Sequence, residues 1–159
     1  GMRADLVGLL WASPVFAEII LFRYYGRLFG KLKPETVLLT AGAVAVARWA
    51  LFPLISGSGL GFSGFLFVQL LHGLTFGAAY IAQQNYLAHA VPEEQSGSAQ
   101  GMAVFVHGII MAFVMLVCGP LYDFTREAGF VVMAVIALAG IALVCWFARL
   151  NAKEGASAP

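Results

Sequence analysis

The chain has 159 residues, of which 61% are hydrophobic and 11% are charged, and its mean hydropathy is +0.88. A soluble domain of ordinary composition is about 45–50% apolar and about 25% charged, so this composition excludes that class and indicates an integral membrane protein. The formal net charge is only +1, and basic residues gather in one short loop, which gives no reason to expect a nucleic-acid partner.

Five apolar stretches are long enough to cross a lipid bilayer. A hydrocarbon core about 30 Å thick takes about 20 residues of helix at about 1.5 Å per residue. The apolar runs are continuous, whereas the strands of a membrane barrel alternate apolar and polar residues. We therefore predict an all-α, polytopic membrane helix bundle. The expected helices are residues 5–25, 35–55, 62–90, 98–122 and 128–149.

The connection after the first span indicates the orientation in the membrane. It carries four basic residues, whereas the next connection, SGSGLG, has no charge. Basic residues concentrate in cytoplasmic loops, so we expect the first connection in the cytoplasm, the N-terminus outside and the C-terminus in the cytoplasm. The four basic residues are Arg23, Arg27, Lys31 and Lys33.

A short internal repeat suggests that the chain belongs to something longer. The pattern G-x-L-[FY] begins at Gly26 and again at Gly119, and each copy is followed by charged residues and the next span. Three spans separate the copies, as an inverted three-helix repeat requires, although a chance match in a glycine-rich chain is the alternative. A real repeat would make residues 1–159 a partial six-helix bundle without its first helix, and the missing N-terminal helices would be its partners.

Four ionisable side chains lie near the middle of four different spans. Glu18, Arg48, His72 and His107 are each about 13–18 Å from an end of their span, near the middle of the bilayer. A charge at that depth costs about 2.5–3.5 kcal/mol on insertion scales, which makes each residue a candidate for function. We expect a central cavity in which Glu18 and Arg48 balance charge and His72 titrates near neutral pH. The alternatives are a charge pair that only joins two helices, a structural hydrogen bond of His72, and a structural His107.

The third span carries further polar residues. Gln69, His72 and Thr75 recur every three residues and therefore share one helix face. Toward the cytoplasmic end of the same span, Gln83, Gln84, Asn85 and His89 either line an exit path or mark the membrane interface.

No enzyme signature is present in the sequence. The histidines lack the H-E-x-x-H spacing, and there is neither G-x-S-x-G nor a glycine-rich phosphate loop after a strand. We therefore expect no catalytic residue, no metal site and no cofactor.

Four stretches taken in order resemble proton symporters of the major facilitator superfamily. They are ASPVFAEIILF (12–22), YGRLFGKLKPE (25–35), AVARWALF (45–52) and VQLLHGLTF (68–76), which are similar to helices eight to ten of that superfamily. The resemblance covers nearly the whole chain and is to the group with phenylpropionate, nucleoside and lactose permeases. It implies a twelve-helix transporter of the bacterial inner membrane, to which this chain contributes helices eight to twelve.

The resemblance implies roles for three of the membrane residues. In lactose permease, the glutamate matching Glu18 contacts substrate, the arginine matching Arg48 assists proton release, and the histidine matching His72 belongs to the substrate and proton network. The superfamily loop implies a gating role for Gly26, Arg27, Gly30 and Lys31.

Three positions depart from lactose permease. That protein has a proton-carrying carboxylate where this chain has Thr75, a lysine where it has Gln69, and a lysine of helix eleven where it has His107. A threonine cannot carry a proton at physiological pH, so coupling by that route is not available. With the proton as coupling ion, Glu18 is expected to be the proton carrier or a substrate contact, and Arg48 its counter-charge or the partner of a substrate carboxylate.

The predicted function is therefore the C-terminal part of a proton-coupled symporter for a small organic solute, such as an aromatic carboxylate, a nucleoside or a sugar. Gly73 and Gly77 form a G-x-x-x-G pattern beside His72, which lets another backbone approach the third span closely. The alternative function is a non-transporting scaffold or partner subunit that assembles through its polar helix faces and through this G-x-x-x-G. Alternating access needs a second bundle, so we do not expect transport by this chain alone.

Overall fold

The computed structural model describes residues 3–157, and in this range the chain is helical with no strand. Five helical units there are long and apolar enough to cross a membrane, which confirms the predicted fold class. The third unit is continuous but includes a short π-helical segment. The elements are α1 (Ala4–Phe29), α2 (Pro34–Gly57), α3 (Gly61–His72), η1 (Gly73–Gly77), α4 (Ala78–Ala90), α5 (Glu93–Thr125), η2 (Arg126–Ala128) and α6 (Gly129–Ser157).

The helices begin and end at residues with clear local reasons. Pro34 opens α2 and Glu35 lies in its first turn, where proline is tolerated and an acidic group favours the helix dipole. The turn between α2 and α3 needs positive φ angles of 75° at Gly59 and 51° at Gly61, which glycine adopts readily. The fourth helix starts earlier than predicted, at Glu93, because hydropathy marks the apolar part of a helix and misses its acidic first turn.

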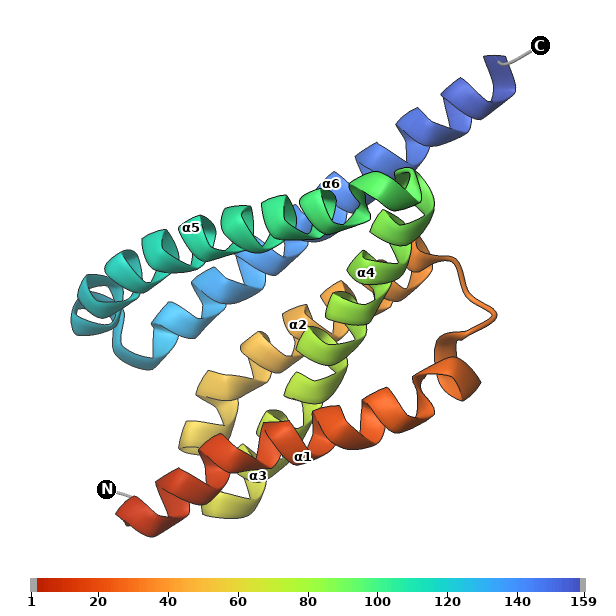
Figure 1. The fold of residues 1–159 in the computed structure, drawn as a ribbon. Helices are drawn as coiled ribbons and strands as arrows, with labels where there is room; N and C mark the ends of the chain where they lie inside the picture. The colour runs from red at the N-terminus through yellow and green to blue at the C-terminus, as the bar shows by residue number, and fades with distance from the viewer. Residues whose placement is uncertain (1–2, 158–159) are drawn as a thin grey trace.

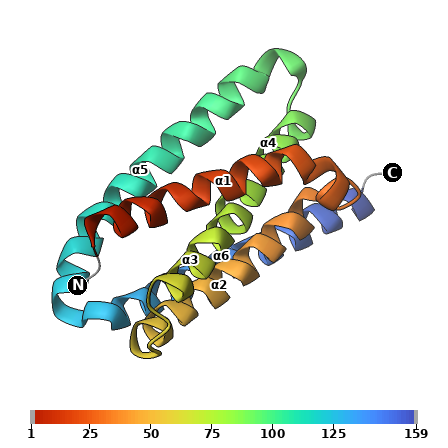
Figure 2. The same cartoon turned by 90° about the horizontal axis from the view of Figure 1, so that it is seen from below.

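The unit α3–η1–α4 lies between α1 and α2. Helix α1 packs along α3 and η1, and α2 packs against α3, η1 and α4 on one side and against α6 on the other (Figures 1 and 2). Alanines in the shared core allow the helices to approach closely. The core consists of Leu21 and Tyr25 from α1, Val37 and Ala41 from α2, and Ala78 and Ala82 from α4.

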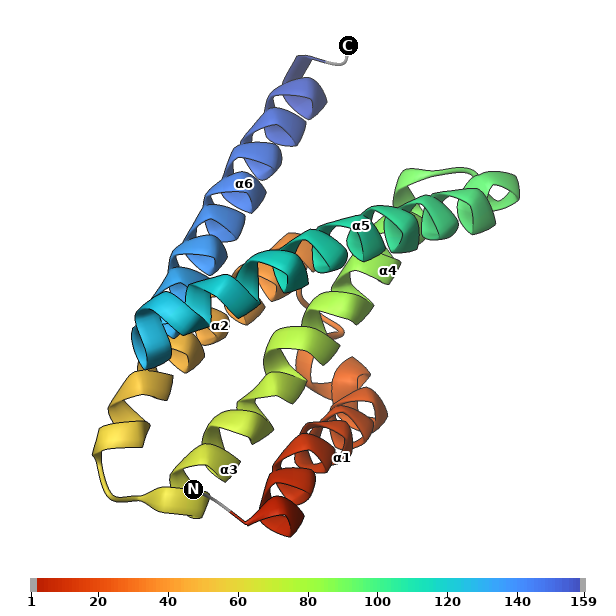
Figure 3. The same cartoon turned by 90° about the vertical axis from the view of Figure 1, so that its left-hand side faces the viewer.

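Helix α5 is the least enclosed element of the bundle. It meets α6 at η2 and then diverges from it, and it also contacts α4 (Figure 3). None of its residues is buried, and Phe113 and Leu116 are 67% and 75% exposed. In a bilayer, lipid or further helices would cover such apolar side chains.

The described ends of the chain lie at opposite ends of the bundle, as five spans require (Figure 1). The end of α4 and the end of α6 lie together, and Asn151 Nδ2 donates a 3.4 Å hydrogen bond to the Tyr86 hydroxyl. The α1–α2 connection is at this same end, where Lys33 and Glu35 line a cavity with Tyr86.

Candidate functional site

Two glycines of the third span bring α1 close to η1. A Cβ atom on Gly73 would lie 2.9 Å from Ala17 Cβ and 3.0 Å from the Ala17 carbonyl carbon, and one on Gly77 would lie 3.0 Å from Leu21 Cδ2. The close backbone approach predicted from G-x-x-x-G is therefore confirmed, and the approaching helix is α1 of the same chain. In this structure α1 of the same chain occupies the glycine face, which leaves the polar helix faces as the surfaces on which the scaffold alternative would depend.

The approach of α1 places Glu18 beside His72. His72 Nε2 lies 3.7 Å from Glu18 Oε1, too long for a hydrogen bond but within ion-pair range, and the two side chains are 35% and 18% exposed. The other ring nitrogen of His72, Nδ1, is buried and has no hydrogen-bond partner in the described part of the chain. Buried polar atoms are nearly always paired, so this nitrogen is a candidate for binding a further group.

Arg48 is held by α3 instead of by Glu18. Its side chain is buried, Nε donates to the Val68 carbonyl oxygen at 3.1 Å, and Nη2 donates to Gln69 Oε1 at 3.0 Å. The guanidinium also stacks 4.4 Å from the centre of the Trp49 ring. Together these contacts offset the cost of burying a cation and fix α2 to α3.

The alternative of a charge pair between the first two spans is therefore wrong. Since α1 packs on α3 and η1, the polar neighbour that Glu18 meets is His72, and α3 supplies the partners of Arg48. The link from Arg48 to Gln69 was missed. The only feature of the sequence that points to this link is that Gln69 shares a polar helix face with His72 and Thr75.

Thr75 and His107 lie outside this network. Thr75 Oγ1 donates to the His72 carbonyl oxygen at 3.1 Å, which satisfies the hydroxyl within its own helix. His107 lines a separate cavity of about 360 Å³ between α4 and α5. The sequence placed Glu18, Arg48, His72 and His107 at one depth, but the structure brings together the first three around α3 and leaves His107 in the neighbouring cavity.

The α4–α5 cavity joins residues that the sequence treated separately. Gln83 and Gln84, which were assigned either to an exit path or to the interface, both line it, as does Thr75. Two aromatic residues of the wall, Phe76 and Tyr80, were not singled out, although they follow His72 at four-residue intervals. Its polar and aromatic lining residues are Thr75, Phe76, Tyr80, Gln83, Gln84 and His107.

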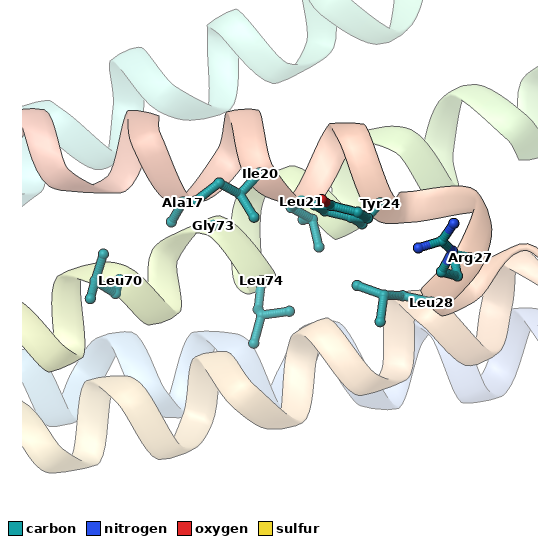
Figure 4. A pocket seen from close by; sticks show the side chains of 9 residues that line it. All are labelled: Ala17, Ile20, Leu21, Tyr24, Arg27, Leu28, Leu70, Gly73 and Leu74. Carbon is teal, nitrogen blue, oxygen red and sulfur yellow. The ribbon is translucent and has the colours of Figure 1, made fainter.

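The expected gating loop is largely helical. Gly26 and Arg27 lie within α1, and the Gly30 N–H donates to the Gly26 carbonyl oxygen at 3.1 Å, so only Gly30 and Lys31 of the four residues follow the helix. Arg27 stacks 5.8 Å from the Tyr24 ring centre and lies at one end of an otherwise apolar cavity of about 310 Å³ between α1 and α3 (Figure 4). The prediction of a loop at Gly26 and Arg27 is wrong, because α1 stays helical until Gly30 caps it.

Among the side chains that the structure describes, no three or more from histidine, cysteine, aspartate or glutamate gather in a way that could hold a metal ion.

Comparison with known proteins identifies the family of the chain. Residues 1–132 match the MFS_1 like family. The chain belongs to this family. It is 30% identical over 138 residues to a probable 3-phenylpropionic acid transporter of Escherichia coli (strain K12), and the alignment covers 87% of the chain but 35% of that relative. No solved structure matches the chain. As a member of the MFS_1 like family with five membrane-length helices, the chain is a multi-pass membrane protein.

Proposed function

We propose that the chain is the C-terminal part of a proton-coupled symporter for a small organic solute, with an aromatic carboxylate as the first candidate. The observation that carries this proposal is the Glu18–His72 pair, a carboxylate 3.7 Å from an imidazole between two membrane-length helices. The E. coli relative named for phenylpropionic acid supports the solute class. Because the chain spans 35% of that relative, the other helices of the transporter would come from an N-terminal part.

In the proposed mechanism, Glu18 binds and releases the transported proton. Ionised Glu18 attracts a protonated His72, whereas protonated Glu18 has no net charge and the attraction is lost. The pair lies where Gly73 and Gly77 let α1 and η1 touch, so the protonation state changes the interaction between these two elements. Arg48 would keep its bonds to α3 throughout and hold the α2–α3 interface fixed.

The remaining parts of the proposal concern the membrane, the coupling ion and the helices that precede this chain. We place the transporter in the bacterial inner membrane, with the N-terminus of this chain outside and its C-terminus in the cytoplasm. The proton is the coupling ion and no cofactor is needed. The chain would form a six-helix bundle together with one preceding helix, and this bundle would move against a second one during alternating access.

Accumulation by whole cells tests the proposal. Cells that produce the complete transporter should accumulate labelled 3-phenylpropionate, and a protonophore should abolish the accumulation. Glu18→Gln should lose accumulation but keep exchange of internal for external substrate, because exchange requires no net proton movement. Glu35→Gln, at the start of α2, is the matched control and should accumulate like the wild type. Normal accumulation by Glu18→Gln would contradict the proposal.

A further inference from the structure

Three aromatic rings form a stack along one face of the third span. The His72 and Phe76 ring centres are 5.5 Å apart with planes 12° apart, and the Phe76 and Tyr80 centres are 6.4 Å apart with planes 11° apart. Residues four positions apart lie one above the other on a helix, and here the series continues through η1 into α4. Phe76 and Tyr80 are 43% and 46% exposed, so two rings of the stack are accessible at the helix surface.

The accessible rings face the α4–α5 cavity. Phe76 and Tyr80 line it from the third span, and His107 lines it from α5. The cavity volume of about 360 Å³ falls within the range of roughly 300–1,000 Å³ that is usual for small-molecule pockets. Leu38, Ala79, Ala103 and Val104 make much of the rest of the wall apolar.

Among the residues that line this cavity, His107 is the one that can carry a positive charge. It makes no hydrogen bond or ion pair with any residue in the described range, unlike His72 with Glu18. A histidine N–H can donate to a carboxylate, and the bond is stronger when the ring is protonated. The cavity therefore pairs flat aromatic surfaces with one group suited to an anion.

We propose that Phe76 and Tyr80 bind the ring of the substrate by stacking, and that His107 binds its carboxylate, which makes aromatic carboxylates the substrate class. This inference rests on the proposed function and adds the residues that select the solute. Aromatic pairs gain energy beyond the area they bury, so a planar ring is favoured over an aliphatic group of the same size. A sugar or nucleoside would need partners for many hydroxyl groups, whereas most of this wall is apolar.

The test compares two acids that differ only in the ring. Initial uptake rates of 3-phenylpropionate and 3-cyclohexylpropionate are measured for the complete transporter, since the second acid has the same chain and carboxylate but no π face. The wild type should have the lower KM for the phenyl acid. Phe76→Leu and Tyr80→Leu should each reduce this preference roughly 2- to 12-fold, the range expected for one aromatic pair. Tyr80→Phe should keep it.

Two controls separate ring binding from other effects. His107→Ala should raise the KM of both acids alike and leave their ratio unchanged, because both carry the carboxylate. Phe113→Leu alters an exposed ring of α5 that does not line the cavity, and it should change neither KM.

Several results would overturn the inference. One is a KM ratio in Phe76→Leu and Tyr80→Leu equal to that of the wild type, or a KM that rises equally for both acids. Loss of folded protein in both leucine variants, with Tyr80→Phe normal, would assign the rings to helix packing and would likewise overturn it. A wild type that transports both acids without preference contradicts this inference alone, whereas a wild type that transports neither contradicts the proposed function itself.

Discussion

Arg48 and Glu18 are both ionisable residues in membrane-length helices, but their surroundings differ. Arg48 is buried and bonded through two nitrogens to Val68 and Gln69, with the Trp49 ring against its guanidinium plane. Glu18 has one ionisable neighbour within ion-pair range, His72, and no hydrogen bond between them. The first arrangement suits a permanent structural cation, and the second suits a group that gains and loses a proton.

Replacing Arg48 by lysine should reduce stability although the charge is kept. The ammonium group of lysine cannot reach the two acceptors with the geometry of a guanidinium and offers no flat surface to Trp49. We expect a loss of about 1.5–3 kcal/mol, the range for hydrogen bonds to charged groups, measured as a lower thermal unfolding midpoint of the purified protein in detergent. Arg23→Lys, at an exposed position of α1, should leave the midpoint unchanged. Equal midpoints for the wild type and Arg48→Lys would show that α3 does not depend on this link.

At the scale of the elements, the central contact is that of η1 with α1. Glycine matters at Gly73 because the backbone of α1 passes where a side chain would start. The π-helical segment begins at this residue, directly after His72. Such segments are frequent at functional sites, and here the segment lies at the contact that brings Glu18 to His72.

Gly73→Ala should weaken this contact. The new methyl group would lie 2.9 Å from Ala17 Cβ and 3.0 Å from backbone, so α1 must move away, at a cost of roughly 1–3 kcal/mol. Gly140→Ala is the matched control in α6, because a Cβ there meets nothing within 4 Å, and alanine should leave stability unchanged or raise it by about 0.5–1 kcal/mol. Thermal unfolding in detergent measures both. A Gly73→Ala protein as stable as Gly140→Ala would contradict the close packing of α1 on η1.

The sequence predicts the helices well and their neighbours poorly. The length of an apolar run shows directly whether a helix can cross the membrane, so all five spans were predicted. Gly73 and Gly77 indicated a close helix contact, because only small residues permit one. The helix that packs on these glycines was not predictable, since the sequence around Gly73 does not indicate that Ala17 of α1 will lie against it. For the same reason the partner of Arg48 was missed, because Gln69 becomes its neighbour only once α2 packs against α3.

At the scale of the whole molecule, the proposed orientation in the membrane rests on one basic connection. Lys31 lies in the connection between α1 and α2, and Ser58 lies in the connection between α2 and α3. Because these connections stand at opposite ends of one span, they lie on opposite sides of the membrane. In a transporter with Cys118 and Cys145 replaced by alanine, a membrane-impermeant maleimide should label Ser58→Cys in intact cells. It should label Lys31→Cys only after permeabilisation. The reverse pattern would contradict the proposed orientation.

The central claim is that Glu18 carries the coupled proton, and proton movement tests it most directly. Proteoliposomes or de-energised cells with the complete transporter are placed in weakly buffered medium, 3-phenylpropionate is added, and the external pH is recorded. The account predicts that the medium becomes alkaline with the wild type, as protons enter with substrate, and that its pH does not change with Glu18→Gln, although that variant still exchanges substrate. Alkalinisation of equal size with Glu18→Gln would contradict the account.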